Sequence, residues 1–206
     1  MKIGFIGLGI MGSRMAANLQ KHDYSLVVFN RTRDKAEPLL GPCGTFSDSP
    51  AKLAQEVEVL FTMLAHPDAV EQAALGANGF LNHLRPNALW VDCSSVNPSF
   101  SQKMAAEAGR RRSRFVDAPV TGSAPVAAEA KLTFWVGANE VDLEVIRSLL
   151  LCMGNKIVHA GGHGMGTSMK MVINLLLGNA MAAFAEAMAL GEGLGLSQKE
   201  IGRAHV

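Results

Sequence analysis

Short apolar runs alternate with stretches of helical period along the first 160 or so residues of this 206-residue chain. The runs end at polar or glycine-rich positions, as β-strands do where they leave a buried sheet. We expect strands at residues 2–6, 25–29, 57–63, 88–92, 115–117, 132–136 and 156–159. Strands that alternate with helices in this way predict an α/β fold with a parallel, doubly wound sheet.

The pattern changes after a glycine-rich break at residues 161–164. From about Met165 to Leu194 a single helical stretch of Met, Leu, Ala and Ile contains no proline. At about 1.5 Å per residue it would reach roughly 45 Å, longer than a crossover helix requires, so we expect an interdomain helix. Five polar residues interrupt the stretch: Lys170, Asn174, Asn179, Glu186 and Glu192. They interrupt it too often for a hydrocarbon environment, so we expect no membrane span.

A glycine-rich segment follows the first predicted strand directly. It comprises Gly7, Leu8, Gly9, Ile10, Met11 and Gly12 and leads into a helical pattern, the context that a dinucleotide site requires. In such a site the first glycine permits a tight turn, the second lets the backbone approach a pyrophosphate, and the third lets the helix lie close to the strand. The phosphates meet the amides at the helix N-terminus. The alternative is an ordinary glycine-rich turn, but the strand-turn-helix context favours a Rossmann-type domain.

The end of the second predicted strand bears on which dinucleotide binds. NAD sites usually place Asp or Glu there to accept a hydrogen bond from the ribose 2′-hydroxyl. This chain has Asn30, Arg31 and Thr32 instead. Because no carboxylate competes and a guanidinium attracts a 2′-phosphate, we expect NADP(H) rather than NAD. The alternative is that Arg31 is a solvated residue of the next helix, which Thr32 would cap.

Composition narrows the classes of function. The residues are 49% hydrophobic and the formal net charge is +1, which does not indicate a nucleic-acid partner. The one basic run, residues 110–112 with Arg114, falls where a helix from about Pro98 should end, so it complements the helix dipole. The three cysteines lack metal-ligand spacing, so we expect no metal site. No leader precedes the first strand, which predicts a cytoplasmic protein.

The predicted long helix carries a polar stripe near its start. Gly166, Lys170, Asn174 and Gly178 recur every four residues and therefore share one face. The glycines would make room at both ends of the stripe, where a lysine can donate a proton and an amide can hold a substrate hydroxyl. The alternative is that Lys170 extends to solvent and Asn174 bridges neighbouring backbone.

Four motifs stand in order along the chain. They are the segment from Gly4 to Gly12, the tetrad Asp92-Cys93-Ser94-Ser95, the heptad from Asp117 to Ser123, and Gly164-x-Gly166-x-x-x-Lys170-x-x-x-Asn174. Together they resemble the β-hydroxyacid dehydrogenases, which include 3-hydroxyisobutyrate dehydrogenase, tartronate semialdehyde reductase and the glyoxylate/succinic semialdehyde reductases. The resemblance covers nearly the whole chain and implies an NAD(P)-dependent enzyme, a homodimer or tetramer when full length.

The resemblance also implies catalytic and substrate-binding residues. Thr121, Gly122 and Ser123 would hold the carboxylate of a small substrate. Lys170 would give a proton to the carbonyl oxygen as hydride arrives, and Asn174 would position that oxygen.

By the same resemblance, Met63, Leu64 and Ala65 would line the cofactor, and Ser95 would contact cofactor and substrate. Two of these residues have simpler alternatives. Thr121 could form a turn beside Gly122, and Ser95 could cap the helix that starts near residue 98.

Ser123 bears on the substrate. Many relatives have a second glycine at this position, and serine looks more like the glyoxylate/succinic semialdehyde reductase branch, although residues 124–131 match neither branch well. We therefore expect an NADPH-dependent reductase of a small aldehyde or keto acid of that type. A 3-hydroxyisobutyrate or tartronate semialdehyde-type dehydrogenase is the alternative. A non-catalytic dinucleotide-binding module is the alternative of another class, and Lys170 with Asn174 argues against it.

These observations divide the chain into three expected parts. Residues 1–162 would form the NADP-binding Rossmann domain, and residues 163–199 would begin a truncated all-α domain for substrate binding and dimerisation. Residues 200–206 resemble a translated adapter sequence, so we expect a non-native tail there.

Overall fold

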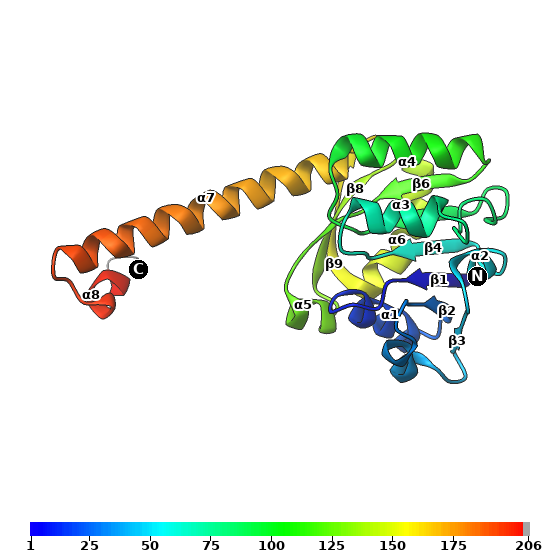
Figure 1. Ribbon diagram of the computed structural model, residues 1–206, viewed down its shortest axis with the longest axis horizontal. Helices are drawn as coiled ribbons and strands as arrows, with labels where there is room; N and C mark the ends of the chain where they lie inside the picture. The colour runs from blue at the N-terminus through cyan, green and yellow to red at the C-terminus, as the bar shows by residue number, and fades with distance from the viewer. Residues whose placement is uncertain (204–206) are drawn as a thin grey trace. The chain divides into compact units, whose positions relative to one another are not determined.

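The computed structural model describes residues 1–203, which form two compact units that divide after Lys170. The first unit is an α/β domain and the second is helical (Figure 1). The division falls within helix α7 (Met165–Gly193), which closely matches the predicted long helix. Residues 204–206, the end of the expected tail, lie outside the described residues.

One sheet forms the centre of the first unit. Its strands are β1 (Lys2–Ile6), β2 (Ser25–Phe29), β3 (Gly44–Phe46), β4 (Val59–Thr62), β5 (Leu89–Asp92), β6 (Arg114–Asp117), β7 (Val120–Thr121), β8 (Leu132–Gly137) and β9 (Gly154–Gly161). The first six strands are parallel and lie in the order β3-β2-β1-β4-β5-β6. This is the strand order of a dinucleotide-binding Rossmann sheet, so the predicted fold class is confirmed.

The prediction that every strand is parallel is wrong. Strand β8 runs antiparallel to both β6 and β7, and β9 then pairs parallel to β8. A parallel return usually needs a long crossover helix, but between β6 and β8 the chain has only β7 and the short helix α5 (Ala124–Ala128). Strands β3 and β7 were not predicted, because runs of three and two residues carry no readable period.

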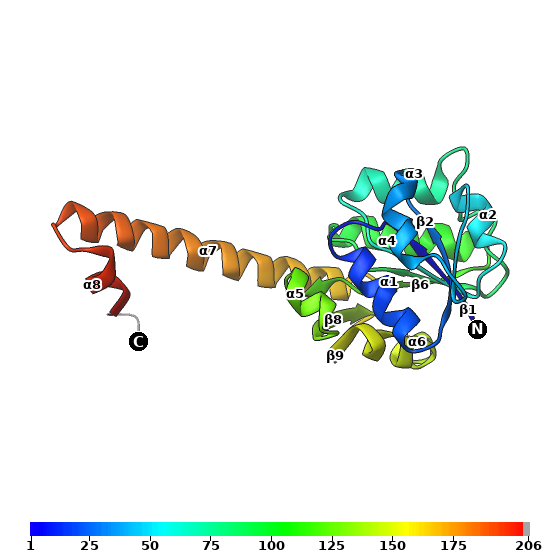
Figure 2. The ribbon, with the colours of Figure 1, turned by 90° about the horizontal axis from the view of Figure 1, so that it is seen from below.

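Helices cover both faces of the sheet (Figure 2). Helices α1 (Gly12–Lys21), α5 and α6 (Glu140–Met153) pack on one face. Helices α2 (Pro50–Ala54), α3 (Pro67–Leu75) and α4 (Pro98–Arg110) pack on the other. A 3-10 helix, η1 (Arg33–Leu39), follows β2, and Thr32 precedes it without a side-chain capping bond.

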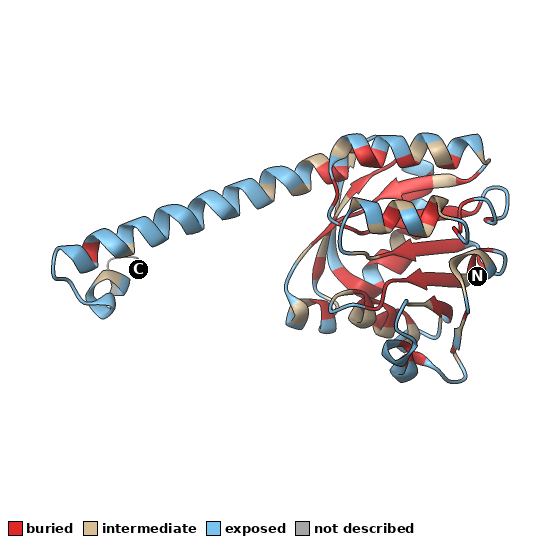
Figure 3. Ribbon diagram, viewed as in Figure 1, coloured by how far each residue is buried: buried red, intermediate tan, exposed pale blue. Residues whose placement is uncertain are grey.

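The central strands β1, β4, β5 and β6 are buried on both faces, which explains their apolar runs, whereas β9 at the sheet edge is exposed or half-buried along most of its length (Figure 3). Successive residues alternate between two cores: Phe61 and Val91 pack with α1 and α6, whereas Trp90 and Phe115 pack with α3 and α4. The Trp90 ring meets Phe80 and Phe115 edge-on, with centroids 4.9 and 4.8 Å apart. Each fully buried large side chain contributes about 1.5–3 kcal/mol to folding, so this double layer holds the strand ends in place.

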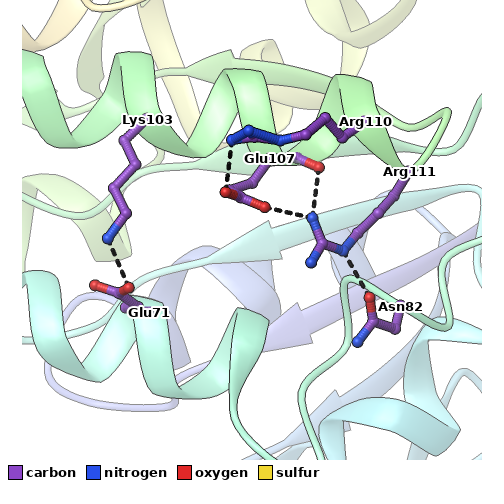
Figure 4. A network of polar contacts seen from close by, with 6 residues as sticks. All are labelled: Glu71, Asn82, Lys103, Glu107, Arg110 and Arg111. Carbon is purple, nitrogen blue, oxygen red and sulfur yellow. Dashed lines mark hydrogen bonds and ion pairs between the residues drawn. The ribbon is translucent and has the colours of Figure 1, made fainter.

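Two arginines of the basic run at the end of α4 are paired within the domain (Figure 4). Arg110 and Arg111 both form ion pairs with Glu107, and Arg111 Nε donates to Asn82 Oδ1 at 2.6 Å. On the same face, an ion pair of 2.7 Å joins α4 to α3. This pair joins the two helices, whereas the Arg111–Asn82 bond joins the end of α4 to the loop after α3.

The second unit comprises the rest of α7 and helix α8 (Gln198–Arg203). Gly191 lets the two helices approach, because a Cβ there would lie 2.5 Å from Cδ1 of Ile201. Many apolar side chains of α7 are exposed, including Leu175, Leu176 and Leu177 at 62–65%. Among the described residues, α7 is the one helix long and apolar enough to cross a membrane by length and composition alone.

Candidate functional site

The carboxyl ends of five parallel strands lie in register at one edge of the sheet. Ile6 of β1 pairs with Phe29 and with Thr62. Thr62 pairs with Asp92, and Asp92 with Asp117. Three candidate segments follow these ends directly: Gly7–Gly12, Asn30–Thr32 and Met63–Ala65. Ser95 comes three residues after the end of β5, and Thr121–Ser123 begins with the last residue of the short strand β7, which follows β6. Ligands of open α/β sheets bind at this edge, so the topology gathers these segments on the side where a cofactor would lie.

The glycines of the first loop differ in what surrounds them. Gly7 has a φ of +98°, and a Cβ there would lie 2.3 Å from the carbonyl oxygen of Met63. A Cβ at Gly12 would lie 1.9 Å from the carbonyl oxygen of Gly7, so glycine is needed for α1 to pack close to the loop. A Cβ at Gly9 would meet nothing within 4 Å. Gly9 therefore leaves open space beside the backbone, as the approach of a pyrophosphate requires.

Asn30 braces this loop from the end of β2. Its Oδ1 accepts a hydrogen bond from the backbone N–H of Leu8 at 2.9 Å, and its Nδ2 donates to the carbonyl oxygen of Thr32 at 2.8 Å. Both ends of the amide thus have partners in the backbone. The next side chain, Arg31, is exposed, whereas Arg33 stacks over the Phe46 ring at 4.7 Å.

A pocket of about 510 Å³ lies over the ends of β1, β2 and β4. Six predicted cofactor residues line it: Gly7, Asn30, Arg31, Thr32, Leu64 and Ala65. Polar residues that the sequence analysis missed also line it: Lys35, His66, Gln72 and Asn78. A second cation close to Arg31 in the sequence was the available signal for Lys35.

After β5, Ser94 is buried and its neighbour, the candidate residue Ser95, is exposed. The Ser94 hydroxyl accepts from the backbone N–H of Leu64 at 2.9 Å, and its own N–H donates to Asp92 Oδ1 at 3.1 Å. Ser94 therefore fixes the loop after β4 to the loop after β5. Ser95 is exposed, and it does not cap α4, because Asn97 accepts the capping bond from an α4 amide at 2.8 Å.

The segment predicted to hold a carboxylate begins at the end of β7. Thr121 closes this strand rather than forming a turn, and its Oγ1 accepts a hydrogen bond from Trp135 Nε1 at 2.8 Å. Gly122 has a φ of +145°, and a Cβ there would lie 2.7 Å from a methyl of Leu132. Ser123 precedes α5 without a side-chain capping bond. Gly122 and Ser123 are both exposed, so the segment can be reached by a ligand.

Asp117, at the end of β6, anchors the start of α7. Its carboxylate accepts from the Gly164 N–H at 2.7 Å, and from the N–H and hydroxyl of Thr167 at 2.8 and 3.0 Å. Thr167 is further held by Ser101 of α4, with the two hydroxyl oxygens 2.8 Å apart. Burial raises the pKa of Asp117, against the effect of these hydrogen bonds. Sequence spacing gave no signal for this anchor, because its partners lie 47 and 50 residues away.

Gly166 has a different role from the one expected. A Cβ there would lie 2.3 Å from the carbonyl oxygen of Trp135 and 2.8 Å from that of Asp117, so its small size lets α7 pack on β6 and β8 rather than making room for a ligand. Lys170, one turn later, is half-buried, and burial lowers its pKa. Among residues 1–203 its ammonium has no hydrogen-bond or ion-pair partner. Asn174 follows one turn further along α7 and is exposed.

Comparisons with known proteins agree with this arrangement. The family model for the NAD-binding domain of 6-phosphogluconate dehydrogenase matches residues 2–162. A probable mitochondrial 3-hydroxyisobutyrate dehydrogenase of Dictyostelium discoideum is 38% identical over 199 residues, which cover 97% of this chain and 62% of that protein. An NAD-dependent L-serine dehydrogenase of Pseudomonas aeruginosa is 39% identical over 198 residues, covering 96% of this chain and 66% of that protein.

A solved structure of Mycobacterium tuberculosis 3-hydroxyisobutyrate dehydrogenase with L-serine superposes with a TM-score of 0.89. It is 32% identical, and the match covers 97% of this chain and 68% of that one. The chain spans less than two thirds of the length of the two curated relatives described above. The matches extend over almost all of this chain, from the glycine loop to α7, and the chain therefore belongs to the β-hydroxyacid dehydrogenase family, with a cofactor domain of the 6-phosphogluconate dehydrogenase type.

Proposed function

We propose that this chain supplies the cofactor-binding domain and the catalytic lysine of an NADP-dependent dehydrogenase that interconverts a small 3-hydroxy acid and its aldehyde. The observation that carries the proposal is the state of Lys170. It is a half-buried amine with a lowered pKa and no partner within residues 1–203, on a helix that Asp117 anchors to the edge where the strands end. A lysine that only stabilised the fold would be expected to pair with a carboxylate where it is partly buried.

The relatives' names support a substrate different from the glyoxylate/succinic semialdehyde type that the sequence favoured. 3-Hydroxyisobutyrate and L-serine are both propanoates with a hydroxyl on carbon 3 and a substituent on carbon 2. Glyoxylate has its carbonyl directly beside the carboxylate, and succinic semialdehyde has it at the far end of a longer chain. The relatives therefore favour a substrate of the 3-hydroxyisobutyrate type over the glyoxylate/succinic semialdehyde type.

The proposed mechanism assigns one task to each group. In the oxidative direction the neutral amine of Lys170 takes the proton from the substrate hydroxyl; in reverse the ammonium returns it to the aldehyde oxygen. The amide of Asn174 would hydrogen-bond the same oxygen. Thr121, Gly122 and Ser123 would donate to the carboxylate and so orient the reacting carbon. When bound, the nicotinamide accepts or supplies the hydride.

We propose NADP(H) as the cofactor because cations, and no carboxylates, line the pocket beyond β2. Arg31 and Lys35 would pair with the 2′-phosphate, while Asn30 is occupied by the backbone. Arg31→Ala should weaken NADPH binding by about 1.5–3 kcal/mol, the range for hydrogen bonds to charged groups, and leave NADH binding nearly unchanged. Titration of both cofactors by calorimetry tests this, and equal losses for both would contradict it.

A substrate panel tests the reaction. The full-length protein with NADP⁺ should oxidise 3-hydroxyisobutyrate or L-serine with a higher kcat/KM than 2-methyl-1-propanol, which has the same hydroxymethyl group without a carboxylate. Reduction of glyoxylate or succinic semialdehyde with NADPH should be slower than reduction of a 3-oxo acid. A preference for the uncharged alcohol would contradict the substrate class. NADPH binding without any turnover would instead support the non-catalytic module.

A further inference from the structure

Trp135 of β8 joins two segments to which the proposed mechanism gives separate tasks. Its indole Nε1 donates to Thr121 Oγ1 at 2.8 Å. Its backbone oxygen lies against Gly166, where a Cβ would approach it to 2.3 Å, and its backbone N–H donates to the carbonyl oxygen of Pro119 at 3.0 Å. Side chain and backbone of one residue thus contact the substrate segment and the first turn of the helix that carries Lys170.

The direction of the indole hydrogen bond determines what the Thr121 hydroxyl can do. An indole N–H is a donor only, so the threonine oxygen must accept from it. The single hydroxyl proton is then left for another acceptor. Accepting one hydrogen bond also polarises the O–H group and strengthens it as a donor. A carboxylate, which only accepts, is the ligand group that fits a hydroxyl prepared in this way.

We propose that Trp135 is a positioning residue that sets substrate specificity: it fixes the Thr121 hydroxyl as a donor and so selects substrates that carry a carboxylate. This inference rests on the proposed function, because it assumes that Thr121 contacts the substrate. It adds a residue from β8 that neither the sequence motifs nor the pocket lining indicated. It also explains why the strand after α5 has an indole, rather than a purely apolar ring, at this half-buried position.

The chain contains a matched control. Its other tryptophan, Trp90, also donates from Nε1 to a threonine hydroxyl, Thr62 Oγ1, at 2.8 Å, but inside the core. Trp90→Phe and Trp135→Phe therefore remove the same kind of hydrogen bond. A purely structural role for Trp135 predicts that both variants lose stability without any change in preference between charged and uncharged substrates.

The experiment measures kcat and KM in the full-length protein for 3-hydroxyisobutyrate and for 2-methyl-1-propanol. Trp135→Phe should raise KM for the acid about 5- to 10-fold, the effect of weakening one hydrogen bond to a charged group, and leave kcat and the KM for NADP⁺ unchanged. The values for the uncharged alcohol should not change. In a Thr121→Val background, Trp135→Phe should cause no further rise in KM, because the hydroxyl it acts through is gone.

Four outcomes would overturn the inference. In the first, Trp135→Phe still raises KM for the acid in the Thr121→Val background; in the second, it raises KM for the uncharged alcohol equally. In the third, its kinetic constants match those of Trp90→Phe, and in the fourth, KM for the acid does not change. If Trp135→Phe does not fold, β-(3-benzothienyl)alanine can be incorporated in the Trp90→Phe protein, since it keeps the indole shape and lacks the N–H. Absence of hydroxy-acid turnover in the unsubstituted protein would overturn the proposed function, and this inference with it; normal turnover with unchanged KM in the variant overturns this inference alone.

Discussion

Asp117 and Asp92 are buried carboxyls on neighbouring strands, in direct register, and the same substitution should destabilise the protein much more at Asp117 than at Asp92. Asp117 accepts three hydrogen bonds spread over both its oxygens, all from the start of α7. Asp92 accepts from Thr62 and Ser94 on Oδ1 alone, and within the described residues its Oδ2 is buried without a partner. Asparagine replaces one of two acceptor oxygens by a donor, so the geometry determines the effect.

In Asp117→Asn the new NH₂ group must face one of the N–H or O–H donors that the carboxylate served. Hydrogen bonds to a charged group contribute about 1.5–3 kcal/mol each, and a buried unsatisfied donor costs about 1–3 kcal/mol. Part of this loss is offset because a buried charge is removed, so we expect a net loss of about 2–4 kcal/mol. In Asp92→Asn the amide oxygen keeps both bonds, while the new NH₂ takes the buried Oδ2 position without a partner among the described residues. The cost of that unsatisfied donor is offset because a buried charge disappears. We therefore expect a change within about 1 kcal/mol, of either sign.

Urea denaturation of both variants at neutral pH measures these free energies of unfolding, provided that the m-value stays unchanged. A pH series adds a second check. Burial raises the folded-state pKa of both groups above the ordinary 3.8, so the folded state keeps a proton that the unfolded state has lost. The stability that each carboxyl contributes therefore falls as pH rises from about 3.8 through its folded pKa. An asparagine does not titrate, so the free energy of unfolding of each variant should lack the part of this fall that the replaced aspartate causes. Equal losses in the two variants would refute the reasoning.

Three other outcomes follow from contacts in the same domain. Gly9→Ala should unfold at the same temperature as the unsubstituted chain yet bind NADPH at least tenfold more weakly. Gly12→Ala should instead destabilise the fold, because its Cβ would lie 1.9 Å from a backbone oxygen. Thermal melts and cofactor titration distinguish the two variants. Asn30→Asp should shift preference toward NADH, since a carboxylate repels the 2′-phosphate, and unchanged relative affinities would argue against it. Because burial lowers the pKa of Lys170, the rate of alcohol oxidation should rise with pH and level off below pH 10.5, while the rate of reduction should fall through the same pKa. A pH-rate profile that changes only at the ordinary lysine pKa would contradict this.

Much of the sheet could be predicted because strands buried on both faces read as apolar runs that end at glycine or polar residues. The glycine loop could be predicted because Gly7 and Gly12 stand where a Cβ would clash with nearby backbone oxygens. The antiparallel direction of β8 could not be predicted, because strand direction depends on the connection between two strands and not on the period of either strand. Strands as short as Val120–Thr121 have no period to read.

The site divides in the same way. The sequence places Lys170 and Asn174 one turn apart on a helix, and the structure keeps that spacing. No sequence pattern indicates that Ser94, next to the candidate Ser95, turns inward and binds the backbone N–H of Leu64. The anchoring role of Asp117 depends on contacts about 50 residues away, and no local pattern encodes such contacts.

Proton transfer by Lys170 is the central claim, and the pH dependence of kcat in Lys170→Met tests it most directly. Methionine keeps the length of the side chain without its proton, so packing and chemistry are separated. In the full-length protein we predict that kcat falls by about 10²–10⁴-fold, the usual contribution of general acid-base catalysis, and that the pH limb assigned to the lysine disappears while NADPH affinity stays unchanged. A methionine variant that keeps most of its kcat with an unaltered pH profile would contradict the account.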